Sequence, residues 1–199
     1  MTDPKPFCDC TKIEAITYQL RGYAQDHGQM WADITIREWN EGGSIDVQSD
    51  LGGYSYTWHA IGNMKLREFL CKLDFDYFMT KTTGRRHLEF DPDKTQEAIL
   101  KDICRARHGN HISRGRARLF YDDVTSVQTA SYMNCLSHFL EVLCDKDALV
   151  REVYCRMGED IEPIRTPTAV SANFWRHIWP AACKVWRDEL AQEVENGCL

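Results

Sequence analysis

The sequence has no long apolar run and no leader-like start. No stretch approaches the ~18 apolar residues that a membrane-spanning helix needs. Residues 1–6 lack the apolar core of a signal peptide. We therefore expect no membrane segment and a cytoplasmic location.

Charge of one sign is not in large excess either. The formal net charge is -6 and the isoelectric point is about 5.6, while 43% of the residues are apolar and 27% are charged. These fractions are typical of a globular protein rather than a disordered one. The mildly acidic balance argues against a general affinity for nucleic acid, and it is too small to indicate a DNA mimic.

The cysteines lack the pattern of a disulfide framework. Their number is odd, they are scattered, and several lie in apolar helical patterns, where a free cysteine behaves as a small hydrophobic residue. We interpret them as thiols. The nine are Cys8, Cys10, Cys71, Cys104, Cys135, Cys144, Cys155, Cys183 and Cys198.

Cys8 and Cys10 raise the alternative of a small Cys/His metalloprotein. A zinc site usually combines two close pairs of ligands, and Cys-x-Cys is a tight spacing for one pair. The second pair would be His108 with His111, or His87 with Cys104. Neither combination has a convincing signature, so we expect no metal and no other cofactor.

The hydrophobic periodicity first favours a helix and then changes to strands. Residues 11–27 favour an opening helix. The runs 32–37, 45–48 and 54–58 alternate apolar and polar side chains between glycine-containing turns, which predicts a three-stranded antiparallel meander. The residues that support the opening helix are Ile13, Ile16, Leu20 and Tyr23, with Thr11 as N-cap and Gly28 as C-cap.

Helical patterns dominate the rest of the chain. One helix begins near residue 64 and is extended by a short turn over 75–79, and residues 132–157 carry two apolar helical stripes. A final helix over about 170–194 contains Pro180, so we expect a kink or break there. Between these lie a helix over 93–108 ended by Gly109, which can take a positive φ, and one over 114–124 with Ser113 as N-cap.

These patterns predict an α+β fold. We expect a three-stranded antiparallel sheet covered by helices, followed by an all-helical C-terminal region. The expected boundary lies near residue 125, which gives an α+β domain over 1–125 and a helical region over 126–199.

In the run from Ser44 to Trp58, a strand that ends in Ser-Asp leads through glycine to an aromatic strand that ends in tryptophan. Further characteristic residues are Phe69, Leu70, Asp76, Tyr77 and Lys81, and in the later segment Arg107, His108, Gly109, Ile112, Ser113, Ala117, Arg118, Leu119 and Tyr121. Through these residues, the segment 32–123 resembles small accessory proteins of tailed bacteriophages and prophages, most of which are uncharacterised. The resemblance implies a cytoplasmic protein of the bacterial host cell that binds and inhibits a host macromolecular complex, such as a CRISPR or other defence system.

Two surfaces are candidates for partner binding. The segment 101–118 is locally basic, with Asp102 as its one acidic residue, and it could contact phosphate or an acidic protein patch. The C-terminal helix is apolar on more than one face, so it either closes a core or leaves tryptophans exposed for a partner. The candidate residues are Trp175, Trp179, Trp186, Arg105, Arg107, Arg114 and Arg116.

We expect a binding protein rather than an enzyme. Ser49, Asp50 and His59 supply the side chains of a hydrolytic site, but the sequence indicates neither a shaped nucleophile turn nor an oxyanion hole. The expected partner is a host protein or ribonucleoprotein complex, and homodimerisation stays open. The alternatives are a nucleic-acid-binding regulator that uses 101–118 and the metalloprotein described above.

The aromatic run of Tyr54, Tyr56 and Trp58 is more typical of the buried face of a sheet than of an exposed aromatic platform.

Overall fold

The computed structural model describes residues 12–127 and 162–197. The chain forms two compact units: unit 1 contains Met1–His87 and Thr168–Leu199, and unit 2 contains Leu88–Pro167. This division differs from the boundary expected near residue 125, which falls within unit 2. The C-terminal helix belongs to the same unit as the sheet, because its apolar residues are buried against that sheet.

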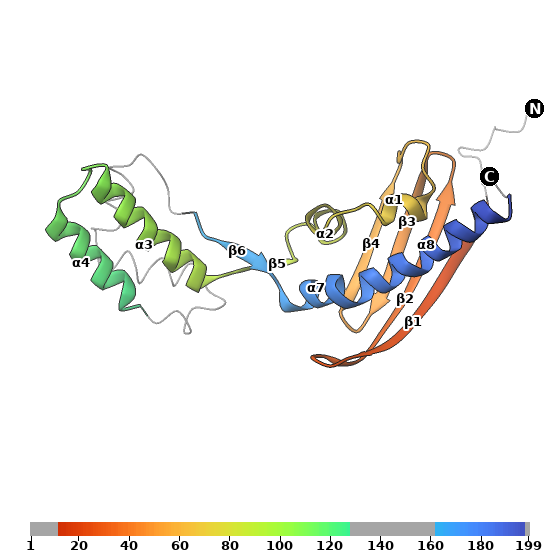
Figure 1. Ribbon diagram of the computed structural model, residues 1–199, viewed down its shortest axis with the longest axis horizontal. Helices are drawn as coiled ribbons and strands as arrows, with labels where there is room; N and C mark the ends of the chain where they lie inside the picture. The colour runs from red at the N-terminus through yellow and green to blue at the C-terminus, as the bar shows by residue number, and fades with distance from the viewer. Residues whose placement is uncertain (1–11, 128–161, 198–199) are drawn as a thin grey trace, which may run out of the picture. The chain divides into compact units, whose positions relative to one another are not determined.

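Unit 1 is built on a four-stranded antiparallel sheet in the order β1-β2-β3-β4 (Figure 1). The three predicted strands are confirmed as β2, β3 and β4, and β1 is an additional strand at one edge. The bounds are β1 (Ala15–Ala24), β2 (Gly28–Trp39), β3 (Gly42–Ser49) and β4 (Gly52–Trp58).

The helix predicted over residues 11–27 is wrong, because most of this segment forms β1. Its residues pair with β2 from Ala15 opposite Arg37 to Ala24 opposite Gly28. Gly28, expected as a helix C-cap, has a φ of 84° beside the hairpin turn between the two strands. The segment also alternates apolar and polar residues from Ile16 to Arg21, and pairing with β2 selects this period over the helical one.

The two faces of the sheet differ in burial. In β2, Ala32, Ile34 and Ile36 are buried, whereas the intervening Asp33 and Thr35 point to the other face and are half-buried. This period-two alternation places apolar side chains on the covered face of the sheet and polar side chains on the solvated face.

A layer of helices covers the apolar face (Figure 1). The predicted helix near residue 64 is present as two short helices, and the expected break at Pro180 is confirmed. The hydrogen bonding changes to a π-helix just before Pro180, which lies at the start of the last helix, where its missing N–H does no harm. The elements are α1 (Leu66–Leu70), α2 (Phe75–Thr83), α7 (Ala169–Asn173), the π-helix η2 (Phe174–Ile178) and α8 (Trp179–Glu195).

An ion-pair network ties α8 to α1. The guanidinium of Arg67 donates to Glu189 at 2.7 Å and to Glu193 at 2.6 Å, and Lys65 donates to Glu193 at 2.7 Å. Hydrogen bonds from Lys65 and then from Arg67 lower the pKa of Glu193. The Tyr18 hydroxyl donates to Glu189 at 2.8 Å, so the network also reaches the edge strand β1.

Unit 2 contains a helical hairpin and a short two-stranded sheet. The predicted helices are confirmed, with Ser113 as N-cap of the second, and α3 and α4 pack antiparallel (Figure 1). Gly109 ends the first helix with a φ of −75°, so the positive φ expected there falls on Asn110 instead. The elements are α3 (Pro92–His108), α4 (Arg114–Thr125), β5 (Leu88–Phe90) and β6 (Arg165–Pro167), with β5 and β6 paired antiparallel.

One predicted helical segment lies outside the part of the chain that the structure describes. It comprises the helical stripes expected over 132–157. Within residues 12–127 and 162–197, no helix is long and apolar enough to cross a membrane.

Candidate functional site on the α3–α4 hairpin

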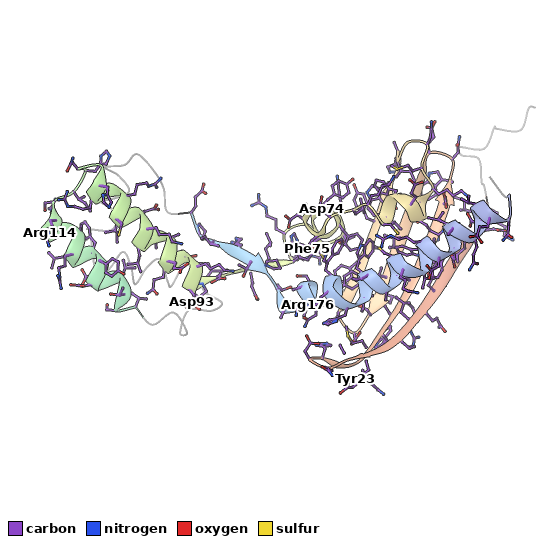
Figure 2. All side chains as sticks on the ribbon, viewed as in Figure 1. Tyr23, Asp74, Phe75, Asp93, Arg114 and Arg176 are labelled. Atoms are coloured by element: carbon purple, nitrogen blue, oxygen red, sulfur yellow. The ribbon has the colours of Figure 1, made fainter. Side chains whose placement is uncertain are left out.

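We call the α3–α4 hairpin the basic hairpin, because most of the basic residues of segment 101–118 lie at one of its ends. Arg105, Arg107 and His108 lie in the last turn of α3, and Arg114 and Arg116 lie in the first turn of α4. Figure 2 places Arg114 at the opposite end of the hairpin from Asp93, which lies in the first turn of α3. The structure therefore brings together the four arginines that the sequence singled out.

Apolar residues on the inner faces hold the hairpin together. Ile103, Ala106, Ile112 and Phe120 are buried. Because these residues take the inward positions, Arg105, Arg114 and Arg116 are directed outward and are exposed, while Arg107 is half-buried. The alternation of Ile103, Ala106 and the arginines thus gives one apolar and one basic face.

At the end of α3, the positive charges suit the helix. The C-terminus of a helix carries a partial negative charge, so Arg105 and Arg107 stabilise it. Arg105 also donates to Asp102 at 2.9 Å, and Arg107 donates to the side-chain oxygen of Asn110 at 3.3 Å. These residues therefore have a structural role alongside any role in binding.

At the start of α4, the charges oppose the helix. Arg114 and Arg116 lie where the helix carries a partial positive charge, and no acidic residue occupies the first turn. A cation at this end is unfavourable by roughly 0.3–1 kcal/mol. Within the described part of the chain, Arg114 has no ion-pair partner, and Arg118 lies 3.8 Å from Asp122. The start of α4 therefore favours a bound anion.

A shallow groove of about 410 Å³ lies between the two helices. Its walls combine basic side chains with the carboxylate of Asp122 and with the ring of Tyr121, which is 43% exposed. Arginines in such a lining can bind a phosphate or a carboxylate, and the ring can contact a planar group. The lining is formed by Ile103, Cys104, Arg107, His108, Ala117, Arg118, Tyr121 and Asp122.

The C-terminal tryptophans lie in the core of unit 1 rather than on its surface. Trp179 and Trp186 are buried, and Trp175 is half-buried and stacks on Trp179 with ring centroids 5.2 Å apart. Of the two interpretations open from the sequence, the structure supports closure of a core. Trp179 and Trp186 therefore present no surface to a partner, because the helix covers the sheet with this face.

The aromatic strand also faces inward, as expected. Tyr54 and Trp58 are buried and Tyr56 is half-buried. The indole of Trp58 donates to the Tyr77 hydroxyl at 3.2 Å, and the Lys81 ammonium lies 5.5 Å from the rings of Tyr56 and Tyr77. Residues on which the phage resemblance rests thus form one cluster between β4 and α2.

The residues considered for hydrolysis stabilise turns. Ser49 donates to the carbonyl of Gly52 at 2.7 Å, and Asp50 accepts from the backbone N–H of Trp31 at 3.1 Å. Ser49 and Asp50 therefore support the turn between β3 and β4.

The described residues contain no cluster of side chains that supports the metalloprotein hypothesis. No group of three or more His, Cys, Asp or Glu side chains there could hold a metal ion. Cys8 and Cys10 lie outside the described residues. His87 is buried in unit 1, where its Nδ1 lies 2.8 Å from the carbonyl of Gly84, whereas Cys104 belongs to unit 2.

One exposed aromatic patch was missed by the sequence reasoning. On the open face of the sheet, Tyr23 and Trp31 are exposed, and the Arg21 guanidinium lies 5.8 Å from the Trp31 ring and 2.8 Å from Asp33. The alternation along residues 16–21 was the signal for this face. Because a helix was predicted over residues 11–27, no exposed sheet face was expected in this segment.

Comparison with known families extends the resemblance seen in the sequence. The family model Phage_phiTE_072, described as a phage family, matches residues 11–196. The chain belongs to this phage family. The match also includes the region beyond residue 123 that the sequence resemblance did not reach. No curated protein and no solved structure matches the chain.

Proposed function

We propose that this phage-family protein acts by binding: its basic hairpin contacts an acidic surface of a host macromolecular complex and inhibits that complex. The residues proposed to make the contact are Arg105, Arg107, Arg114 and Arg116. The carrying observation is the placement of Arg114 and Arg116 in the first turn of α4, where they add to the positive end of the helix.

The charge distribution supports this proposal. The whole chain carries a net charge of -6, yet segment 101–118 has six lysines and arginines against one acidic residue. A local field of opposite sign to the net charge orients the protein as it approaches an acidic surface. Such charges raise the rate of association and select the partner more than they raise affinity.

The exposed position of the hairpin also supports binding over catalysis. Its arginines are held on two packed helices, so a partner can bind them without ordering a loop first. Arginine suits carboxylates and phosphates equally well through paired N–H donors. A defence complex that contains nucleic acid would offer phosphates, and one with an acidic protein surface would offer carboxylates.

The test compares two charge-reversal variants in pull-downs from a bacterial host lysate. The first is Arg114→Glu/Arg116→Glu in the hairpin. The matched control is Arg85→Glu/Arg86→Glu, which changes the same charge at exposed residues of unit 1. We expect the hairpin variant to lose about tenfold or more in recovery of the complex, equivalent to ~1.4 kcal/mol, and the control to recover it fully.

The same variants should be compared for inhibition of the captured complex. Equal recovery and equal inhibition by wild type and hairpin variant would contradict the proposed binding surface. Equal loss in both variants would show that net charge alone, not the hairpin, governs the interaction.

A second candidate function is regulation through direct nucleic-acid binding by the basic hairpin. The local excess of arginine favours it, while the acidic balance of the whole chain opposes it. Binding of this kind predicts an affinity for DNA or RNA that falls steeply with salt. Replacing Arg114 by glutamine would then lower the slope of log K against log salt by about one. Filter binding without salt-sensitive retention would contradict this function.

A further inference from the structure

Two thiols meet between α1 and α8 in the helical layer of unit 1. Cys71 is the C-cap of α1, and Cys183 lies in α8, 112 residues further along the chain. In its neutral form, the Cys71 thiol donates to the main-chain oxygen of Cys183 at 3.6 Å. Cys71 is half-buried and Cys183 is buried, so reagents reach the first more easily than the second.

The surroundings favour ionisation of Cys71. A hydrogen bond from the Cys183 thiol is the main reason that the pKa of Cys71 falls from 9.0 to about 7; burial opposes this effect and the nearby Arg187 adds to it. The Arg187 guanidinium donates to the Cys71 carbonyl at 3.4 Å, which fixes a positive charge beside the sulfur. Conversely, the hydrogen bond to Cys71 and burial raise the pKa of Cys183.

We infer that Cys71 and Cys183 form a reactive dithiol, with Cys71 as the attacking thiol and Cys183 as the resolving one, whose oxidation links α1 to α8. The inference rests on the contact between the two residues, on the difference in their burial and on the cation beside Cys71. It does not depend on the proposed function of the basic hairpin.

The oxidant is a low-molecular-weight disulfide. The Cys71 thiolate attacks one sulfur of that disulfide, forms a mixed disulfide and releases one small thiolate. Cys183 then gives up its proton to solvent and attacks the Cys71 sulfur, which forms the protein disulfide and releases the second small thiolate. The small disulfide is reduced to two thiols, and the two protein thiols are oxidised.

The link would join two helices that both pack on the sheet. Because it closes a loop of more than a hundred residues, it restricts the unfolded chain strongly. Oxidation should therefore raise the midpoint of thermal unfolding of unit 1. The same bond would resist opening of the α1–α8 layer, which the ion pairs of Arg67 also hold closed.

The first test measures alkylation of Cys71 by iodoacetamide against pH, with peptide mass spectrometry. We expect a half-maximal rate near pH 7, whereas Cys183→Ala, which removes the hydrogen-bond donor, shifts it upward toward 9. Cys183→Ser keeps a donor and serves as the control that stays nearer to wild type. At pH 7, the lower pKa corresponds to ~50-fold more thiolate, reduced to about six-fold in rate by its weaker nucleophilicity. A wild-type midpoint near 9 would overturn the inference.

The second test follows oxidation of the full chain by oxidised glutathione. We expect a Cys71–Cys183 cross-linked peptide in the wild type, and Cys71 held as its mixed disulfide with glutathione in Cys183→Ala. The exposed Cys104 provides an internal reference in the same digest. A wild type that accumulates the mixed disulfide at Cys71, without the cross-linked peptide, would show that Cys183 does not resolve it. Circular dichroism of each variant checks that it is folded.

Discussion

Trp186 joins α8 to the sheet through its ring contacts. It is fully buried and meets Tyr18 edge-on, with ring centroids 6.1 Å apart, and Trp179 with centroids 5.7 Å apart. Aromatic pairs in this geometry add to the stabilisation that burial of the side chain gives. The ring therefore contributes to the stability of unit 1 rather than to recognition of a partner.

We expect Trp186→Ala to lower the free energy of unfolding by about 3–5 kcal/mol, because it leaves a large cavity in the core. The control is Trp31→Ala on the open face, where the side chain is 41% exposed. Its loss should be about 1 kcal/mol or less, since it removes one exposed cation–π contact. Urea unfolding followed by circular dichroism measures both. Equal losses would contradict the assignment of Trp186 to the core.

Two tyrosines make stability sensitive to alkaline pH. Burial raises the pKa of Tyr54 to about 12 from 10.0, and burial, followed by the hydrogen bond to Glu189, does the same for Tyr18. Between pH 10 and 12, the folded chain keeps phenolic protons that the unfolded chain loses. The stabilisation is therefore complete below pH 10 and is lost as the pH rises through 12.

We expect the free energy of unfolding to fall between pH 10 and pH 12, and to fall less steeply in Tyr54→Phe. This substitution keeps the ring and removes the group that ionises, together with the hydrogen bond from its hydroxyl to the carbonyl of Leu51. Urea unfolding at a series of pH values measures the slope. The same slope in both proteins would show that Tyr54 does not titrate in this range.

Helix α1 lies directly on the sheet because β3 begins with glycine. A Cβ added to Gly43 would come within 2.7 Å of the Leu66 side chain and 2.9 Å of the Arg37 carbonyl oxygen. Leu66 is fully buried. The contact between α1 and β3 thus depends on the missing side chain, since a carbonyl oxygen of the neighbouring strand cannot move aside.

We expect Gly43→Ala to lower the free energy of unfolding by about 1–3 kcal/mol through overpacking. Gly22→Ala is the matched control, because it also changes a strand glycine and a Cβ there meets nothing within 4 Å. The control should be neutral or slightly stabilising. Thermal unfolding of both variants gives the comparison. A loss of similar size in Gly22→Ala would point to backbone effects rather than to the contact with Leu66.

At the scale of the whole molecule, unit 1 is assembled from both ends of the chain. Unit 2 is inserted between His87 and Thr168, and the backbone N–H of Thr168 donates to the His87 carbonyl at 2.8 Å. The two ends of unit 1 are therefore adjacent at the insertion point. Among the described residues, the core of unit 1 draws its buried side chains from both of these segments.

We expect a chain in which a Gly-Ser linker replaces residues 88–167 to fold and to unfold cooperatively, because the linker only has to bridge two neighbouring ends. The contrasting control is a chain truncated after residue 167, which removes Phe174, Trp179 and Trp186 from the core and should not fold. Circular dichroism with thermal unfolding measures both. A linker variant without a cooperative transition would show that unit 1 requires unit 2.

The sequence by itself determined the elements whose signals are local. Alternation and turn residues placed β2, β3 and β4, and the capping residue Ser113 placed the start of α4. The basic hairpin could be predicted for the same reason. Arg105, Arg107, Arg114 and Arg116 lie within twelve residues, so two helices and a short loop are enough to bring them together.

Only the tertiary structure decided the features that depend on distant partners. Residues 15–24 fit two periods, and the hydrogen bonds of β2 made them an edge strand rather than a helix. Trp179 and Trp186 face inward because the sheet some 130 residues earlier offers an apolar face to cover. The meeting of Cys71 with Cys183 has the same origin. Local sequence encodes period and caps, whereas burial is settled by which surface the folded chain brings opposite each residue.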